Sequence, residues 1–115
     1  MSKRSDEHNE RGKGAELLVA DYLRNNGHKV LEMNWRTRWC EVDVISTKKK
    51  CAYLTEVKFR SSDEWGSGFD YITKKKLAQM HFAAEFWISS SHWCGEVQLL
   101  AAQVDASNNV TIIEI

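Results

Sequence analysis

The segment between residues 29 and 59 constrains the fold most, because three strand-like stretches follow one another there without a helix between them. Lys29–Trp35, Trp39–Ser46 and Ala52–Phe59 are rich in β-branched and aromatic residues. The polar stretch Thr47–Lys50 predicts a hairpin turn between the last two. Three successive strands predict a sheet that must be covered on at least one face by other elements.

Helices are predicted before and after this segment. From about Ala15 to Asn26, apolar residues recur at helical spacing, and Asn26-Gly27 predicts the helix end. A second helix is predicted over about Lys74–Ser89, with Thr73 as its N-cap. The two apolar stripes are Ala15, Leu18, Val19, Tyr22 and Leu23 in the first helix and Leu77, Met80, Ala84, Trp87 and Ile88 in the second.

Two closing strands, Glu96–Val104 and Val110–Ile115, complete the predicted secondary structure, with a turn at 105–109. The predicted class is α/β, with a central mixed β-sheet flanked by helices and the order αβββαββ. Residues 1–11 are predicted as a flexible polar tail and residues 12–115 as one domain.

Composition narrows the class of protein. Lys plus Arg and Asp plus Glu number 16 each, so the net charge is zero, which weighs mildly against a nucleic-acid binder. Three widely spaced cysteines, Cys40, Cys51 and Cys94, argue against a disulfide framework and against structural zinc. No stretch approaches the roughly 20 apolar residues that span a bilayer. We therefore expect a cytoplasmic protein without a membrane partner.

Charged residues interrupt two of the predicted strands. Alternation places Glu41, Asp43 and Ile45 on one face of their strand and Glu56 and Lys58 together on one face of the next. If the hairpin pairs these strands, two carboxylates and an ammonium converge. Such charges in apolar strands cost free energy unless they are paired or bind a metal.

A fourth charge belongs to the predicted first helix. Glu16 lies seven residues before Leu23, only about 20° away around the helix. Its carboxylate is therefore expected at the edge of the buried face.

Metal-dependent phosphodiester hydrolysis suits this set of groups. Mg²⁺ or Mn²⁺ prefers oxygen ligands, which Asp43, Glu56 and the backbone carbonyl of Val57 would supply. Lys58 could orient the attacking water or stabilise the charged transition state. The alternative is a cross-strand ion pair at the sheet edge, with little energetic value.

Basic and aromatic residues suggest where a nucleic acid would bind. Three lysines in the first turn of the second helix form a potential phosphate site, with a solvated face as the alternative. Trp65, in a Ser/Gly-rich loop, is the tryptophan that sequence reasoning places nearest to substrate. The full candidate set for substrate binding is Arg36, Arg38, Arg60, Lys74, Lys75, Lys76 and Trp65.

Several short motifs occur in an order that resembles a known family. They run across about residues 12–90, and the ordered set is more specific than any one of them. They are Gly14-Ala15-Glu16, Ala20-Asp21-Tyr22-Leu23, Asn34-Trp35-Arg36-Thr37-Arg38, Glu41-Val42-Asp43-Val44-Ile45, Thr55-Glu56-Val57-Lys58-Phe59-Arg60 and Lys75-Lys76-Leu77. The chain resembles the YraN-like family of small bacterial proteins, a branch of the PD-(D/E)XK nuclease superfamily.

This resemblance implies a restriction-endonuclease-like fold and a relationship to Holliday-junction resolvases. It maps Asp43, Glu56 and Lys58 onto metal and catalytic positions, with Glu16 as the acid on the helix and Glu41 as a supporting acid. Two departures stand out. Cys40 replaces the glycine that the family usually has before Glu-x-Asp, and Gly95-Glu96-Val97-Gln98-Leu99 replaces the family's Arg-Phe-Asp-Val strand.

The predicted function is that of a metal-dependent endonuclease that hydrolyses phosphodiester bonds in DNA. Branched and single-stranded DNA are the substrates considered. Two alternatives remain open: a non-catalytic nucleic-acid-binding module of the same fold, and a small interaction domain with a structural ion-pair network. A homodimer is compatible with cutting two strands, but the sequence identifies no interface.

Overall fold

The structure, a computed structural model, describes residues 3–60 and 69–115. The predicted mixed α/β class is confirmed, because the described residues form two helices and a five-stranded sheet. In chain order the elements are α1 (Lys3–Asn25), β1 (Lys29–Arg36), β2 (Glu41–Lys48), β3 (Cys51–Phe59), α2 (Lys74–Ser91), β4 (Glu96–Val104) and β5 (Val110–Glu114).

The strands lie in the sheet in the order in which they occur in the chain, β1-β2-β3-β4-β5. β1, β2 and β3 pair antiparallel, β3 pairs parallel with β4, and β4 pairs antiparallel with β5. A parallel pair requires a crossover connection, and α2 lies in that connection between β3 and β4. The sheet is therefore mixed, as predicted.

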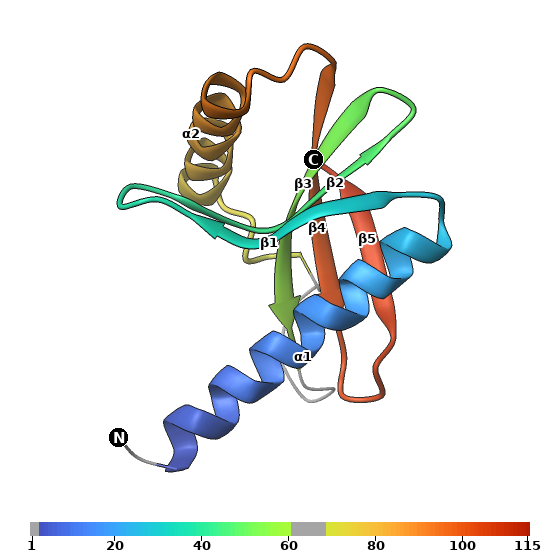
Figure 1. Cartoon of the computed structure of the whole chain (residues 1–115). Helices are drawn as coiled ribbons and strands as arrows, with labels where there is room; N and C mark the ends of the chain where they lie inside the picture. Colours follow the sequence, from blue (N-terminus) through green and yellow to red (C-terminus); the bar gives the residue numbers. More distant parts are fainter. Residues whose placement is uncertain (1–2, 61–68) are drawn as a thin grey trace.

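The two helices pack against different apolar cores on opposite faces of the sheet; in Figure 1 α1 runs diagonally across the strands and α2 stands at the upper left. Each helix contributes to its own apolar core. The α1 core contains Ala15, Val19, Ala20, Leu23, Val44, Leu100, Ala102 and Val104. The α2 core contains Val42, Ile45, Ala52, Leu54, Met80, Ala83, Ala84, Trp87 and Leu99.

The first helix differs from its prediction at its start and in its buried face. α1 begins at Lys3 instead of about Ala15, so the helix is longer than predicted, and the flexibility expected of residues 1–11 stays a prediction. Periodicity does not detect this part because it is polar on all sides, although charged residues such as Lys, Arg and Glu are good helix formers. Ala20 is fully buried, whereas Tyr22, predicted on the apolar stripe, is 42% exposed.

Two predicted helix boundaries, the end of α1 at Gly27 and the start of α2 at Thr73, are confirmed. Gly27 ends α1 with a φ of 89°, and the His28 N–H reaches back to the Leu23 carbonyl at 3.0 Å. The Thr73 hydroxyl accepts the Lys76 N–H at 3.1 Å, which confirms the predicted N-cap of α2. Within residues 3–60 and 69–115, no helix combines the length and the apolar character needed to cross a membrane.

Gly95 sets how the chain returns from α2 to the sheet, and it provides a test of the packing. A Cβ atom at this position would overlap the Lys50 backbone carbonyl and lie 2.8 Å from the Trp93 ring. Because backbone must move to make room, Gly95→Ala is expected to lower the free energy of unfolding by about 2–3 kcal/mol in urea denaturation.

Gly14→Ala is the matched control, since nothing lies within 4 Å of its added Cβ. In the helix this change should be neutral or stabilising by up to about 1 kcal/mol. Equal stability of the two variants would show that Gly95 does not pack against the β2–β3 turn in this way.

Candidate active site

The β1–β2 hairpin twists sharply at Asp43. Val42 packs in the α2 core and Val44 in the α1 core, although residues two apart on a regular strand share a face. Their partners in β1, Trp35 and Met33, divide between the two cores in the same way. Asn34, between those partners, has a φ of 53°. The predicted alternation along Glu41–Ile45 is therefore wrong at this point.

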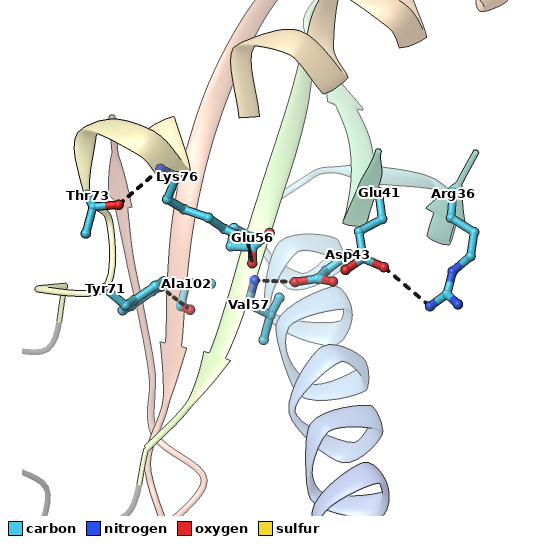
Figure 2. A network of polar contacts seen from close by, with 9 residues as sticks. All are labelled: Arg36, Glu41, Asp43, Glu56, Val57, Tyr71, Thr73, Lys76 and Ala102. Carbon is cyan, nitrogen blue, oxygen red and sulfur yellow. Dashed lines mark hydrogen bonds and ion pairs between the residues drawn. The ribbon is translucent and has the colours of Figure 1, made fainter. Parts of the chain in front are cut away.

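The twist brings the Asp43 carboxylate next to the backbone of β3. The β2–β3 ladder has its last pair at Val44 and Thr55. One step further, Asp43 Oδ2 accepts the N–H of Val57 at 2.7 Å (Figure 2). The Asp43 side chain thus takes the place of a ladder hydrogen bond at the position where the two strands separate.

Glu16 approaches Asp43 from α1. It hydrogen-bonds to the side chains of Asn34 and Asp43, while its Oε2 atom is buried without a partner among the described residues. Burial raises the pKa of Glu16, and the negative charges of Glu41 and Glu56 raise it further, although the two hydrogen bonds oppose this shift. A buried, partly unsatisfied carboxylate beside a second one is energetically costly.

Asp43 is the most perturbed acid of the group. Burial raises its pKa from 3.8 to about 7, with further contributions from the charges of Glu56, Glu16 and Glu41. The hydrogen bond from Val57 lowers the pKa but does not compensate. Carboxylates from α1, β2 and β3 therefore interact here with too little positive charge to keep Asp43 fully ionised at neutral pH.

Among the residues that the structure describes, Glu56 forms an ion pair, whereas none joins Glu16 or Asp43 to a cation. Its Oε1 atom lies 2.8 Å from Lys76 Nζ, and the Glu56 side chain is only 18% exposed. Figure 2 shows Glu56 and the Val57 amide between Lys76 and Asp43. Lys76, predicted as a phosphate-binding residue, is thus the lysine that contacts the acidic group.

Lys58 lies two residues after Glu56 in β3 and is exposed. Within residues 3–60 and 69–115, no ion pair joins it to Asp43 or Glu56. The structure thus leaves the predicted catalytic lysine exposed to solvent, and its convergence with the two acids stays a prediction. For Val57 the observed contact is through its N–H, and the use of its carbonyl as a metal ligand stays a prediction.

A cleft of about 670 Å³ lies between the β1–β2 turn and the first turns of α2. Glu41 and Glu56 contribute carboxylates to it, and Arg36, Lys75 and Lys76 contribute cations. Arg36 pairs with Glu41 at 3.4 Å, which places the predicted supporting acid at the rim in an exposed ion pair. Glu56 therefore borders a hollow whose lining carries three cations and two carboxylates among neutral side chains.

The other predicted substrate-binding residues are more dispersed. The Arg38 guanidinium lies 5.4 Å from the centre of the Trp39 ring, and that of Arg60 lies 5.5 Å from the centre of the Tyr71 ring. Lys74 is exposed at the start of α2 and does not line the cleft. Trp65 lies outside the described residues.

The chain matches the family model described as the uncharacterised protein family UPF0102 over residues 15–115. A UPF0102 protein of Christiangramia forsetii is 35% identical over 92 residues, which cover 80% of this chain and 77% of that protein. One of Flavobacterium johnsoniae is 39% identical over 83 residues, covering 72% and 68% of the two chains.

The chain belongs to the UPF0102 family. The family to which its motifs pointed is thereby confirmed, whereas membership of the nuclease superfamily stays a prediction. The matched range of the UPF0102 family contains Glu16, Asp43, Glu56 and Lys58.

Cys40, the departure from the usual family glycine, fits this UPF0102 chain without strain. Its φ is not positive, so no conformation reserved for glycine is needed there. Its N–H and that of Trp39 both donate to the Thr37 hydroxyl, at 3.2 and 3.1 Å. The thiol lies 3.4 Å from the same hydroxyl oxygen, so the turn is held by Thr37.

The acidic group of this UPF0102 protein has the donor chemistry that Mg²⁺ prefers, and the partnerless Glu16 oxygen and the raised Asp43 pKa both indicate missing positive charge. Within residues 3–60 and 69–115, however, no three Asp, Glu, His or Cys side chains already have the arrangement of a metal site. Glu56 is paired with Lys76 and Asp43 with the Val57 amide. The residues therefore fit a divalent cation chemically, provided that side chains such as Glu56 reorient.

Sequence reasoning missed three features of this UPF0102 site. It did not predict the contact of Glu16 with Asn34, the ion pair between Glu56 and Lys76, or the exposed aromatic side chains of Trp39 and Phe82 in the cleft. Trp39 was assigned to a strand, and Phe82 lies off the apolar stripe of α2. One signal in the sequence could have predicted that Phe82 is exposed: it is a large aromatic residue that lies outside the apolar stripe of α2.

Proposed function

We propose that this protein is a metal-dependent nuclease of the restriction-endonuclease-like fold, hydrolysing phosphodiester bonds in DNA. The observation that carries the proposal is the convergence of Glu16, Asp43 and Glu56 from three different elements, with Glu56 in the wall of a cleft that also carries three cations. Buried carboxylates without sufficient positive charge reduce stability, so their presence is better explained by a cationic ligand than by packing.

Asp43 and Glu56 would hold Mg²⁺ or Mn²⁺, and Glu16 would support them from α1. A divalent ion in such a site neutralises charge that develops on a phosphate and lowers the pKa of a water molecule. The Val57 N–H donates to Asp43 Oδ2 and so holds this carboxylate against β3, in the position where it would bind the metal. In this proposal Asp43 and Glu56 bind the metal, and Glu16 holds them in position.

Lysines would supply the remaining positive charge. Lys58, exposed beside Glu56, is free to approach a phosphate oxygen or the attacking water. Lys76 neutralises Glu56 in the metal-free protein, and when a cation takes over that role its ammonium can turn toward a phosphate in the cleft. Lys75 lines the same cleft and would add to the attraction for the DNA backbone.

A second candidate function is favoured by the Lys76–Glu56 ion pair itself. A lysine permanently bound to Glu56 would leave a nucleic-acid-binding module that cannot recruit a metal. The two functions differ in whether turnover accompanies binding.

The test is incubation of the purified protein with single-stranded, duplex and four-way-junction DNA, in Mg²⁺, in Mn²⁺ and in EDTA. Metal-dependent cleavage is expected, and Glu56→Gln should reduce its rate at least tenfold because a carboxylate ligand is lost. Glu85→Gln, at an exposed position of α2 away from the cleft, is the matched control and should cleave like the wild type.

Binding without cleavage under all metal conditions would establish the second candidate function instead. Cleavage that survives in EDTA, or that Glu56→Gln leaves unchanged, would rule out the proposed metal site.

A further inference from the structure

Two large aromatic side chains are exposed at the cleft. Trp39 is 64% exposed and Phe82 is 50% exposed, and both line the cavity that contains Glu56. Trp39 comes from the β1–β2 turn and Phe82 from α2, so they face the cavity from two separate elements. Contact between so much aromatic surface and water is unfavourable in free energy, and a ligand that covers the rings would remove this contribution.

The two rings are held in place from behind by a third ring. Phe86, half-buried in α2, lies 5.8 Å from Trp39 and 6.3 Å from Phe82 between ring centroids. Phe86 also contacts Trp35 of β1 at 6.1 Å. The exposed pair is therefore an ordered surface, supported by the core, and we call Trp39 and Phe82 the aromatic wall.

Positive charge accompanies this surface. The Arg38 guanidinium lies 5.4 Å from the centre of the Trp39 ring, and Lys75 lines the cleft as an exposed cation. An aromatic ring next to a guanidinium and an ammonium matches a ligand that carries both a flat ring and a phosphate. A protein partner would need an aromatic side chain and separate carboxylates in the right places, whereas every nucleotide carries a ring and an anionic phosphate together.

We propose that the aromatic wall binds an unpaired nucleobase of single-stranded DNA, by stacking on Trp39, while Arg38 and Lys75 contact the adjoining phosphates. This inference rests on the proposed nuclease function and narrows its substrate. In a duplex the base faces are covered by neighbouring bases, so the wall selects single-stranded DNA or the unpaired part of a branched molecule. The cleft then leads the phosphate backbone past Glu56.

Binding in EDTA tests the inference without any cleavage. Fluorescence anisotropy of a labelled oligothymidylate of about 20 nucleotides should show Trp39→Ala binding about tenfold more weakly, and Trp39→Phe close to the wild type, since any aromatic face supports stacking. An oligonucleotide of the same length with abasic sites should bind the wild type as weakly as oligothymidylate binds Trp39→Ala. Duplex affinity should be unchanged.

Tyr22→Ala is the matched control, because this exposed aromatic residue of α1 lies outside the cleft. It should bind oligothymidylate like the wild type. The salt dependence of binding should be the same for Trp39→Ala and the wild type, because no charge is removed.

Four results would overturn the inference: no nucleic-acid binding at low salt, equal affinity for abasic and normal oligonucleotides, an equal loss for duplex and single strands, or dissociation of a dimer by Trp39→Ala. The last would make the wall a contact between copies of the chain. Failure of the nuclease proposal has a different signature, in which Trp39-dependent binding is present but Mg²⁺ and Mn²⁺ produce no cleavage.

Discussion

Asp43→Asn is expected to raise the free energy of unfolding of the metal-free protein by about 2–4 kcal/mol near pH 8, while reducing metal-dependent cleavage about a thousandfold. The two effects have opposite signs because one carboxylate causes both. Its burial beside Glu56 and Glu16 disfavours the charged form that a metal requires. Asparagine removes the charge, and its carbonyl oxygen can still accept the Val57 N–H.

The gain in stability depends on pH in a definite direction. Since the pKa of Asp43 is raised from 3.8 to about 7, the folded protein retains a proton that the unfolded chain releases between these values. The free energy of unfolding of the wild type therefore decreases as the pH rises through this range and becomes level above about pH 7. Asp43→Asn lacks this decrease, so its advantage should be close to zero near pH 4 and complete near pH 8.

Urea denaturation of both proteins in EDTA at several pH values measures this difference. Asp21→Asn is the control, since the Asp21 side chain is 68% exposed and its change should stay within about 0.5 kcal/mol. Added Mg²⁺ should stabilise the wild type near pH 8 but not Asp43→Asn. A variant that is less stable than the wild type at every pH would show that Asp43 is a structural residue.

Much of the fold follows from local signals. β4 has the predicted bounds, the Thr73 cap is present, and the turn between β2 and β3 lies within the predicted stretch. These features depend on residues close together in the chain, so the sequence pattern contains them. The first turns of α1 could not be predicted from the sequence, because a segment that is polar on all sides has no apolar periodicity to detect.

The candidate site could be predicted from the sequence only in part, and the reason differs from that for α1. That Asp43 and Glu56 interact follows from pairing adjacent strands, and the wheel position of Glu16 follows from helical geometry. The twist at Asn34 and Asp43 depends on the two cores that the hairpin must fill, which strand alternation does not include. Likewise, the Lys76–Glu56 contact depends on how the crossover places α2 over β3.

Lys58 and Lys76 should have different roles, the first in cleavage and the second in stability, and replacing each with alanine tests this. Lys58→Ala is expected to slow cleavage about a hundredfold, as removal of a donor to the transition state does, and to change stability by less than about 0.5 kcal/mol because Lys58 is exposed. Lys76→Ala should instead lower the free energy of unfolding by about 1–2 kcal/mol, because it leaves the largely buried Glu56 beside Asp43 without a counter-ion.

The effect of Mg²⁺ on stability should also differ between the Lys76→Ala and Lys58→Ala variants. If a cation replaces Lys76 at Glu56, saturating Mg²⁺ should restore most of the stability lost in Lys76→Ala, since the negative charge is then compensated again. Lys75→Ala, the neighbouring exposed position, is the stability control and should unfold like the wild type with or without Mg²⁺. Cleavage rates and urea denaturation of the three variants provide the comparison. Should Lys76→Ala stop cleavage while Lys58→Ala cleaves normally, the lysine that acts on the phosphate would be supplied by α2 and not by β3.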